Sequence, residues 1–274
     1  MSLLNKIISL FITLLLSQLN ISGQSRYAVE RVPFSSPYYD EFCPTHWESY
    51  LVFCSNQEDA FLLSYQDSRN KGLFNMFKVS FDSLGRSTKP AVLSKDLVTP
   101  FNDGPAAFSP DGNQMAYSRN QEVDARLRNV FKLSNSLGIY FAELENEVWV
   151  PKGEFPHNNP EYSLTTPCFS PDGRFLYFAS DHPEGYGGSD LYRSEWKEGS
   201  WGEPQNLGAE INTGGNEAYP FLAENGDLFF ASDGHDGLGG KDIFLTRLEG
   251  RQWMKPIHLE YPINSRGDDF GLVT

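Results

Sequence analysis

One unit is written twice between Phe169 and Gly271, and this repeat constrains the fold more than any other feature of the chain. At an offset of 52, the segments Phe169–Tyr219 and Phe221–Gly271 align over 51 positions without a gap, and 16 of these positions are identical. A repeat of this length is typical of solenoids and propellers, in which each unit buries its apolar face against its neighbours.

Within each copy, short apolar runs alternate with turn residues. Phe175–Ala179 and Leu228–Ala231 are continuously apolar, which predicts strands covered on both faces. The segment Ser170–Gly173 reads SPDG and predicts a tight turn. Proline restricts φ to a value that suits a turn, and Asp-Gly tolerates the backbone conformation that a tight turn requires. Asp190–Tyr192 opens a third strand, and Trp201–Leu207 forms a fourth whose proline is tolerated at an outer edge. Four short strands per unit, each sheet covered by its neighbours, predict the blade of a β-propeller.

The same pattern continues upstream at longer spacing. The pair Asp111 and Gly112 repeats the turn formed by Asp172 and Gly173. Equivalent strand positions are Phe53, Tyr117, Phe178 and Phe230, so the spacing falls from 64 to 61 to 52 and the first two repeats carry longer loops. We therefore predict an all-β fold: a β-propeller of four-stranded antiparallel blades, with four complete repeats and the first strand of a fifth. The expected boundaries are 37–102, 103–163, 164–217, 218–268 and 269–274.

The motifs FSPDGRFLYFASD, GYGGSDLY, W-x-x-P-x-x-L and NTGGNEAYPF resemble the WD-like propeller repeat of the TolB-like type. More closely, they are similar to the propeller modules of OmpA-family envelope proteins in bacteria that carry a type IX secretion system. The resemblance covers residues 37–274 and implies a periplasmic or outer-membrane-associated role near envelope or secretion machinery. In those envelope proteins the propeller usually accompanies a peptidoglycan-binding domain. This sequence contains no counterpart of that domain, so the resemblance does not imply peptidoglycan binding.

Residues 1–23 have the features of an export signal: Lys6, an apolar stretch over Ile7–Leu16, and small residues at Ser22 and Gly23. A stretch of ten residues is too short to span a bilayer, which needs ~20. No cysteine lies near the cleavage region, so we expect an exported protein that is not a lipoprotein. Residues 24–36 form a leader that could be an edge strand or a linker.

The last residues of the sequence repeat the start of a blade. Phe270–Thr274 follows the second copy as the opening strand of a fifth repeat would. We expect such a chain to be a fragment with an incomplete ring, in which one face of the fourth blade is uncovered and liable to pair with another chain. The alternative is a four-bladed ring in which the tail covers the first blade.

The charge and the thiols narrow the choice of partners. With 36 acidic and 22 basic residues, the net charge is -14, which argues against nucleic acid and anionic membranes as partners. No membrane insertion is expected after removal of the signal. The odd number of cysteines leaves one of Cys43, Cys54 and Cys168 without a partner in an oxidising compartment, and buried free thiols are favoured over a disulfide.

Two long loops are the candidate partner-binding elements. Asn56–Gly72 and Arg119–Leu137 replace the Gly-rich connector and contain apolar and basic residues that no turn requires. Loops on a rigid scaffold often carry recognition, although these residues could also extend strands or pack on the rim. The candidate contact residues are Phe61, Leu62, Leu63, Arg126, Arg128, Val130, Phe131 and Lys132.

Catalytic signals are weak. The five histidines lie in separate segments without zinc spacing, and no nucleophile elbow, P-loop or dinucleotide motif is present. Asp233, Asp236 and Asp242 could converge on calcium, but aspartate in a Gly-rich turn is usually a local hydrogen-bond acceptor. We therefore expect no cofactor and no enzymatic activity: an exported scaffold for protein partners. The alternative is a glycan-binding or glycan-hydrolysing propeller, which convergent carboxylates and exposed aromatic residues in a central funnel would favour.

Overall fold

The computed structural model describes residues 27–57, 72–121 and 136–274. The predicted export signal and all eight candidate loop residues lie outside these described ranges.

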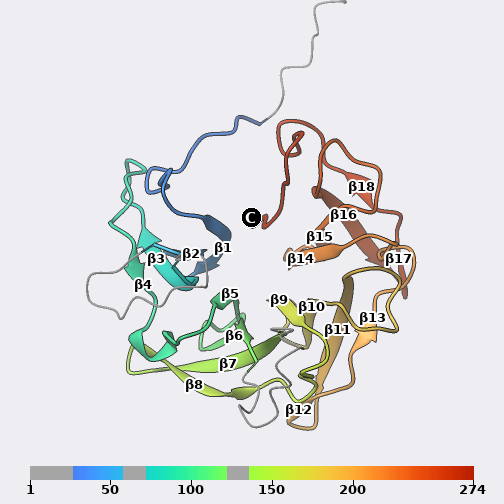
Figure 1. The fold of residues 1–274 in the computed structure, drawn as a ribbon, viewed down its shortest axis with the longest axis horizontal. Helices are drawn as coiled ribbons and strands as arrows, with labels where there is room; N and C mark the ends of the chain where they lie inside the picture. Colours follow the sequence, from blue (N-terminus) through green and yellow to red (C-terminus); the bar gives the residue numbers. More distant parts are fainter. Residues whose placement is uncertain (1–26, 58–71, 122–135) are drawn as a thin grey trace, which may run out of the picture.

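Four antiparallel sheets follow one another around a central axis as the blades of a 4-blade β-propeller (Figure 1). This confirms the predicted fold class.

Blade 1 contains β1 (Glu41–Trp47), β2 (Tyr50–Ser55), β3 (Asn75–Ser80) and β4 (Ala91–Val92), and is followed by the short helix η1 (Lys95–Leu97). Blade 2 contains β5 (Asp103–Phe108), β6 (Gln114–Asn120), β7 (Leu137–Glu145) and β8 (Val148–Glu154). Blade 3 contains β9 (Leu164–Phe169), β10 (Phe175–Ser180), β11 (Asp190–Lys197), β12 (Ser200–Trp201) and β13 (Gln205–Asn206). Blade 4 contains β14 (Glu217–Leu222), β15 (Asp227–Ser232), β16 (Asp242–Glu249), β17 (Gln252–Trp253) and β18 (Ile257–His258).

Each blade is a meander that runs outward from the axis, with β1, β5, β9 and β14 innermost. In blades 3 and 4 the outer strand is split into two short pieces, which flank Pro204 and Pro256. Proline cannot donate to a ladder hydrogen bond. The predicted fourth strand is therefore present but interrupted.

Every innermost strand contains a bulge at the same place. Cys43, Gly104, Thr166 and Tyr219 have positive φ values of 50°, 104°, 52° and 55°, and the register of each inner pair shifts beside them. Each of these residues precedes a proline. Equivalent bulge residues on the inner strands of blades 3 and 4 are 53 positions apart in the sequence, whereas equivalent residues on their second strands are 52 apart. The turn between β14 and β15 is therefore one residue shorter than the turn between β9 and β10.

The C-terminal tail, residues 270–274, repeats this geometry. Gly271 has a φ of 75°, and a Cβ added to it would lie 3.2 Å from the Cα of Cys43 on β1. On the other side, the Phe270 ring stacks on Tyr219 of β14 with a centroid distance of 4.6 Å. The tail thus lies in a fifth inner position between β14 and β1 (Figure 1), but its residues form no strand, so the predicted first strand of a fifth repeat is not formed.

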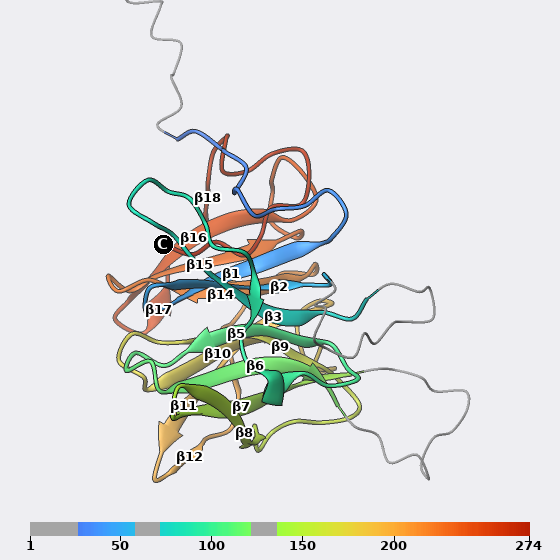
Figure 2. The same cartoon turned by 90° about the vertical axis from the view of Figure 1, so that its left-hand side faces the viewer.

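The core consists of the apolar layers between neighbouring blades, which lie face to face (Figure 2). The four positions that the repeat made equivalent are all buried: Phe53, Tyr117, Phe178 and Phe230 are at most 3% exposed. Continuous apolar runs form these strands because both faces of a blade contact a neighbour.

The leader covers the face of blade 1 that is turned away from blade 2. The Phe34 ring stacks on Phe53 at 4.7 Å and packs against Phe77 and Val79. Residues 27–29 form no strand, so the leader acts here as a covering segment. Among the described residues, no helix is long and apolar enough to cross a membrane.

Candidate functional site

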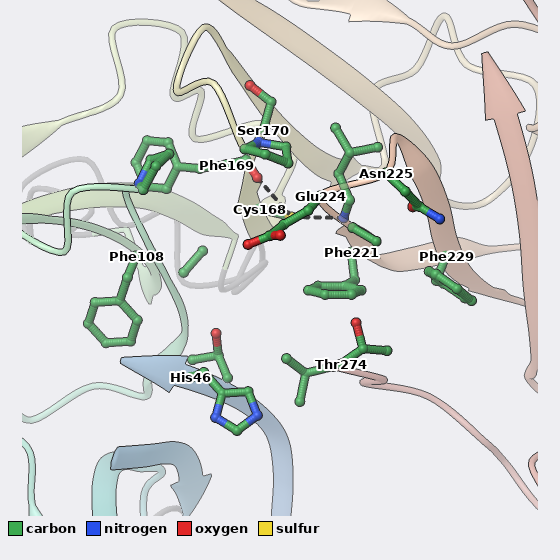
Figure 3. A pocket seen from close by; sticks show the side chains of 17 residues that line it. His46, Phe108, Cys168, Phe169, Ser170, Phe221, Glu224, Asn225, Phe229 and Thr274 are labelled. Carbon is green, nitrogen blue, oxygen red and sulfur yellow. Dashed lines mark hydrogen bonds between the residues drawn. The ribbon is translucent and has the colours of Figure 1, made fainter. Parts of the chain in front are cut away.

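A large hollow opens at the central axis, on the side of the turns between first and second strands. Its volume is about 760 Å³, which is within the range of ligand sites in proteins. Four phenylalanines line it from three blades: Phe108, Phe169, Phe221 and Phe229 (Figure 3). We call this hollow the mouth. Its walls are mainly apolar because the inner strands end there with the residues that also pack between blades.

The polar groups of the mouth are few and separate. His46 and Asn225 are exposed at its edge, and Ser170 lies in the wall. Among the described residues that line it, Glu224 supplies the one carboxylate side chain. Glycoside hydrolysis by the usual route needs two carboxylates across the sugar, so this arrangement does not supply that chemistry.

Beyond the mouth, the channel narrows to a ring of prolines: Pro44, Pro105, Pro167 and Pro220. The thiol of Cys168 lies between the two regions and accepts a hydrogen bond from the Leu222 amide at 3.4 Å. Burial raises the pKa of Cys168 to about 11. The thiol is therefore protonated at neutral pH and is not a nucleophile. Cys43, Cys54 and Cys168 are all buried and unpaired.

None of the predicted turn residues lines the mouth: Asp111, Asp172 and Gly173 line a separate, smaller hollow, and their contacts are structural. Ser109 and Ser170 donate hydroxyl hydrogen bonds to Asp111 and Asp172, at 2.5 and 2.6 Å. These bonds are the main reason why the pKa of each carboxyl is lowered. Both aspartates are thus acceptors at neutral pH. Gly112 and Gly173 have φ values of 72° and 70°, a conformation that side chains with a Cβ avoid.

An apolar row leads outward from the mouth across blade 4. Phe221 pairs with Phe229, Phe229 with Leu245, and Leu245 with Ile257, so the four side chains share one face of the sheet. Ile257 is 63% exposed and the other three are half-buried. We call this row the outer face of blade 4.

The same row in blade 3 is covered. Cys168 and Tyr177 correspond to Phe221 and Phe229, and they are 8% and 3% exposed because blade 4 lies on them. Blade 4 has blade 3 on one side, whereas the tail and the leader lie toward its other side (Figure 1). The outer face of blade 4 therefore has the chemistry of a blade interface without the equivalent cover.

Sequence reasoning did not identify the mouth or this row. The bulge hid the correspondence, because the gapless alignment at 52 matched Phe221 to Phe169 instead of Cys168. The recurring X-Pro pair on the inner strands is the signal that could have revealed the bulge.

Two of the three aspartates considered for calcium have separate partners. Asp242 accepts hydrogen bonds from the amides of Leu238 and Gly239, and Asp233 pairs with Lys241 at 2.8 Å. Over the part of the chain that the structure describes, no three histidine, cysteine, aspartate or glutamate side chains gather in a way that could hold a metal ion.

Comparisons with known proteins concern the fold. No family model and no curated protein matches the sequence. Among solved structures, TolB from Acinetobacter baumannii is similar over 80% of this chain and 43% of its own, with 12% identity and a TM-score of 0.43. A puromycin-hydrolyzing peptidase from Mycobacterium tuberculosis is similar over 86% of this chain and 42% of its own, with 13% identity and a TM-score of 0.43. An α-L-arabinofuranosidase from Lactobacillus brevis is similar over 81% of this chain and 75% of its own, with 14% identity and a TM-score of 0.43. The chain thus spans less than half of the first two proteins.

This comparison corrects one prediction. We expected a protein that is not an enzyme, and that prediction is contradicted by the peptidase and the arabinofuranosidase among the structures that share the propeller fold. Propellers host unrelated functions, so the absence of familiar catalytic motifs was too weak a basis for excluding catalysis.

Proposed function

We propose that this protein is an exported β-propeller that binds a protein partner in the cell envelope, in the periplasm or at the outer membrane, beside envelope or secretion machinery. The location follows from the predicted export signal and from the resemblance to envelope propellers. The observation that carries the binding proposal is the outer face of blade 4, whose half-exposed apolar row continues into the mouth.

The physical argument is that the apolar row on the outer face of blade 4 is partly exposed to water. An apolar row at a blade interface gains roughly 25 cal/mol for each Å² removed from water. Blade 3 gains this free energy for Tyr177, which is 3% exposed, whereas its counterpart Phe229 on blade 4 is only half-buried. Contiguous apolar surface of this kind on a soluble protein marks an interaction site.

The charge of the chain favours protein over the other large partners. A net charge of -14 repels nucleic acid and anionic lipid surfaces. The face itself is a sheet surface with aromatic and aliphatic residues, which matches the buried centre of protein interfaces.

The test places a charge on the face and measures capture. The protein without its signal is immobilised, and envelope extract from the source cells is passed over the wild type and over Ile257→Glu. We expect a specific protein to be retained by the wild type and at least tenfold less by Ile257→Glu. Gln205→Glu is the matched control, because Gln205 is the exposed equivalent of Ile257 on blade 3 and should leave retention unchanged.

Equal retention by all three proteins would count against the face. Retention of oligosaccharide without any protein would count against a protein partner altogether.

A further inference from the structure

A second hollow lies between blades 2 and 3, at the opposite end of β10 from the SPDG turn. Its volume is about 480 Å³. Its walls combine aromatic rings with hydrogen-bonding groups, which contrasts with the apolar mouth. The lining includes His157, Tyr162, His182, Glu184, Tyr192 and Glu203.

The hollow exists because one connector is short. After each of blades 2, 3 and 4, an asparagine side chain makes two hydrogen bonds to the backbone of the third strand: Asn158 to Ile139, Asn212 to Leu191, and Asn264 to Ile243. Between the last residue of the outer strand and this asparagine, blades 3 and 4 each have five residues, 207–211 and 259–263. Blade 2 has three, Phe155, Pro156 and His157, so its connector is two residues shorter.

The missing residues matter because their counterparts fill the next junction. Between blades 3 and 4, Ile211 is fully buried and its carbonyl accepts a hydrogen bond from His235 Nε2 at 2.8 Å. His235 also packs on Phe244 at 5.1 Å. Between blades 2 and 3 the short connector brings no such carbonyl, and the hollow occupies the space.

His182 presents a donor at this place. Its Nδ1 accepts the Glu184 amide hydrogen at 3.1 Å, so the neutral ring carries its proton on Nε2. The ring is held edge to face against Tyr162, with a centroid distance of 4.6 Å. By contrast, both nitrogens of His157 are occupied, by Glu203 at 3.3 Å and by the Trp201 carbonyl at 3.1 Å.

The remaining groups complete a set of donors and acceptors. Glu184 and Glu203 contribute carboxylates, and the hollow has no lysine or arginine in its described lining, which disfavours an anionic ligand. Tyr192 is buried, and that burial raises the pKa of its hydroxyl. It is therefore a donor as well as an acceptor at neutral pH.

We propose that this hollow binds a neutral sugar ring. A sugar hydroxyl can accept from a histidine N–H and donate to a carboxylate at once, and the apolar face of the ring can lie on Tyr162. The volume of the hollow falls in the range of small-molecule sites. The sugar would take the place of the carbonyl that Ile211 supplies at the next junction. This sugar site is independent of the protein-binding role proposed above, because it lies in a different hollow.

The test is saturation-transfer NMR on the purified protein with D-glucose, D-galactose, L-arabinose and N-acetylglucosamine, each also as a β-linked disaccharide. We expect saturable binding of at least one of them, with a Kd of about 10 mM or tighter. Disaccharides that bind better than the free sugars would indicate a glycan chain as the source, and the reverse would indicate a free sugar.

The decisive variant fills the hollow. Pro156 and His157 are replaced by Gly-Ala-Glu-Ile, the sequence of residues 208–211, and binding should fall at least tenfold with an unchanged or higher Tm. Should that variant fail to fold, Glu184→Gln gives the same test, with an expected loss of at least fivefold at unchanged Tm. Glu224→Gln in the mouth is the control and should bind as the wild type does. Failure of every sugar to bind, or binding that neither variant weakens, would overturn the proposal.

Discussion

Blades 3 and 4 share one repeat pattern, with 16 of 51 aligned positions identical, yet blade 3 lies between two blades and blade 4 has an exposed side. Tyr177 on blade 3 is 3% exposed, while its counterpart Phe229 is half-buried and lines the mouth. The same residue pattern thus serves as core in one copy and as surface in the next. In a repeat fold, the neighbouring repeat decides burial as much as the residues of the repeat itself.

The largest difference should appear when the two equivalent rings are truncated. Tyr177→Ala should lower the free energy of unfolding by about 3 kcal/mol or more, since it leaves a cavity between blades. Phe229→Ala should cost about 1 kcal/mol, because part of its area already faces water. Urea denaturation of both variants measures the difference. Equal losses would mean that the outer face of blade 4 is covered as fully as that of blade 3.

The turns between first and second strands should behave alike in both blades, which sharpens the comparison. Gly173 and Gly226 have φ values of 70° and 85°. Valine at either position is forced into the left-handed region, at a cost of roughly 1–2 kcal/mol. Gly173→Val and Gly226→Val are expected to lower Tm by similar amounts. An unchanged Tm for Gly173→Val would remove the assignment of that turn.

The equivalent buried aspartates of the two blades, Asp190 and Asp242, differ in the side chain that lies beside the carboxylate. In blade 3, Asn206 donates to Asp190 at 2.7 Å. In blade 4, His258 Nε2 is 3.5 Å from Asp242 Oδ1, and this buried oxygen has no hydrogen-bond partner. His258→Asn should therefore stabilise the protein by about 1 kcal/mol, measured by urea denaturation. The reverse exchange, Asn206→His, should destabilise it, and a stabilising effect there would contradict the comparison.

The smallest effect concerns pH. Ser170 is the main cause of the lowered pKa of Asp172, and blade 4 has Ala223 at the corresponding place. Because the pKa in the folded state is below the ordinary value of 3.8, this bond stabilises the protein above that pH and is lost as pH falls through the folded pKa. Ser170→Ala should cost about 0.5 kcal/mol at pH 7.

The same variant should lose less stability than the wild type when the pH is lowered from 7 to 3. Thermal melts at the two pH values check this. Parallel losses in both proteins would show that the serine does not control Asp172.

The sequence was sufficient for the fold because the repeat specifies both strands and turns. Apolar runs such as Phe175–Ala179 mark strands covered on both faces, and the SPDG turn marks their connection. The position of the tail was also anticipated, since Phe270–Thr274 repeats the start of a blade, although these residues form no strand.

The mouth and the hollow beside His182 could not be predicted from the sequence in the same way. The mouth forms where inner strands from different blades converge, and the hollow beside His182 forms where a connector is two residues short. Both depend on relations between repeats that a gapless alignment at 52 conceals. A comparison of connector lengths, anchored on Asn158 and Asn212, would have located the second hollow.

The central claim is that the outer face of blade 4 contacts a partner protein. It is tested most directly by placing the photo-crosslinking residue p-benzoylphenylalanine at Ile257 and, as the matched control, at Gln205. We expect irradiation in source cells to give one discrete protein adduct from position 257 and none from position 205. Adducts from both positions with the same pattern, or from neither, would contradict the claim.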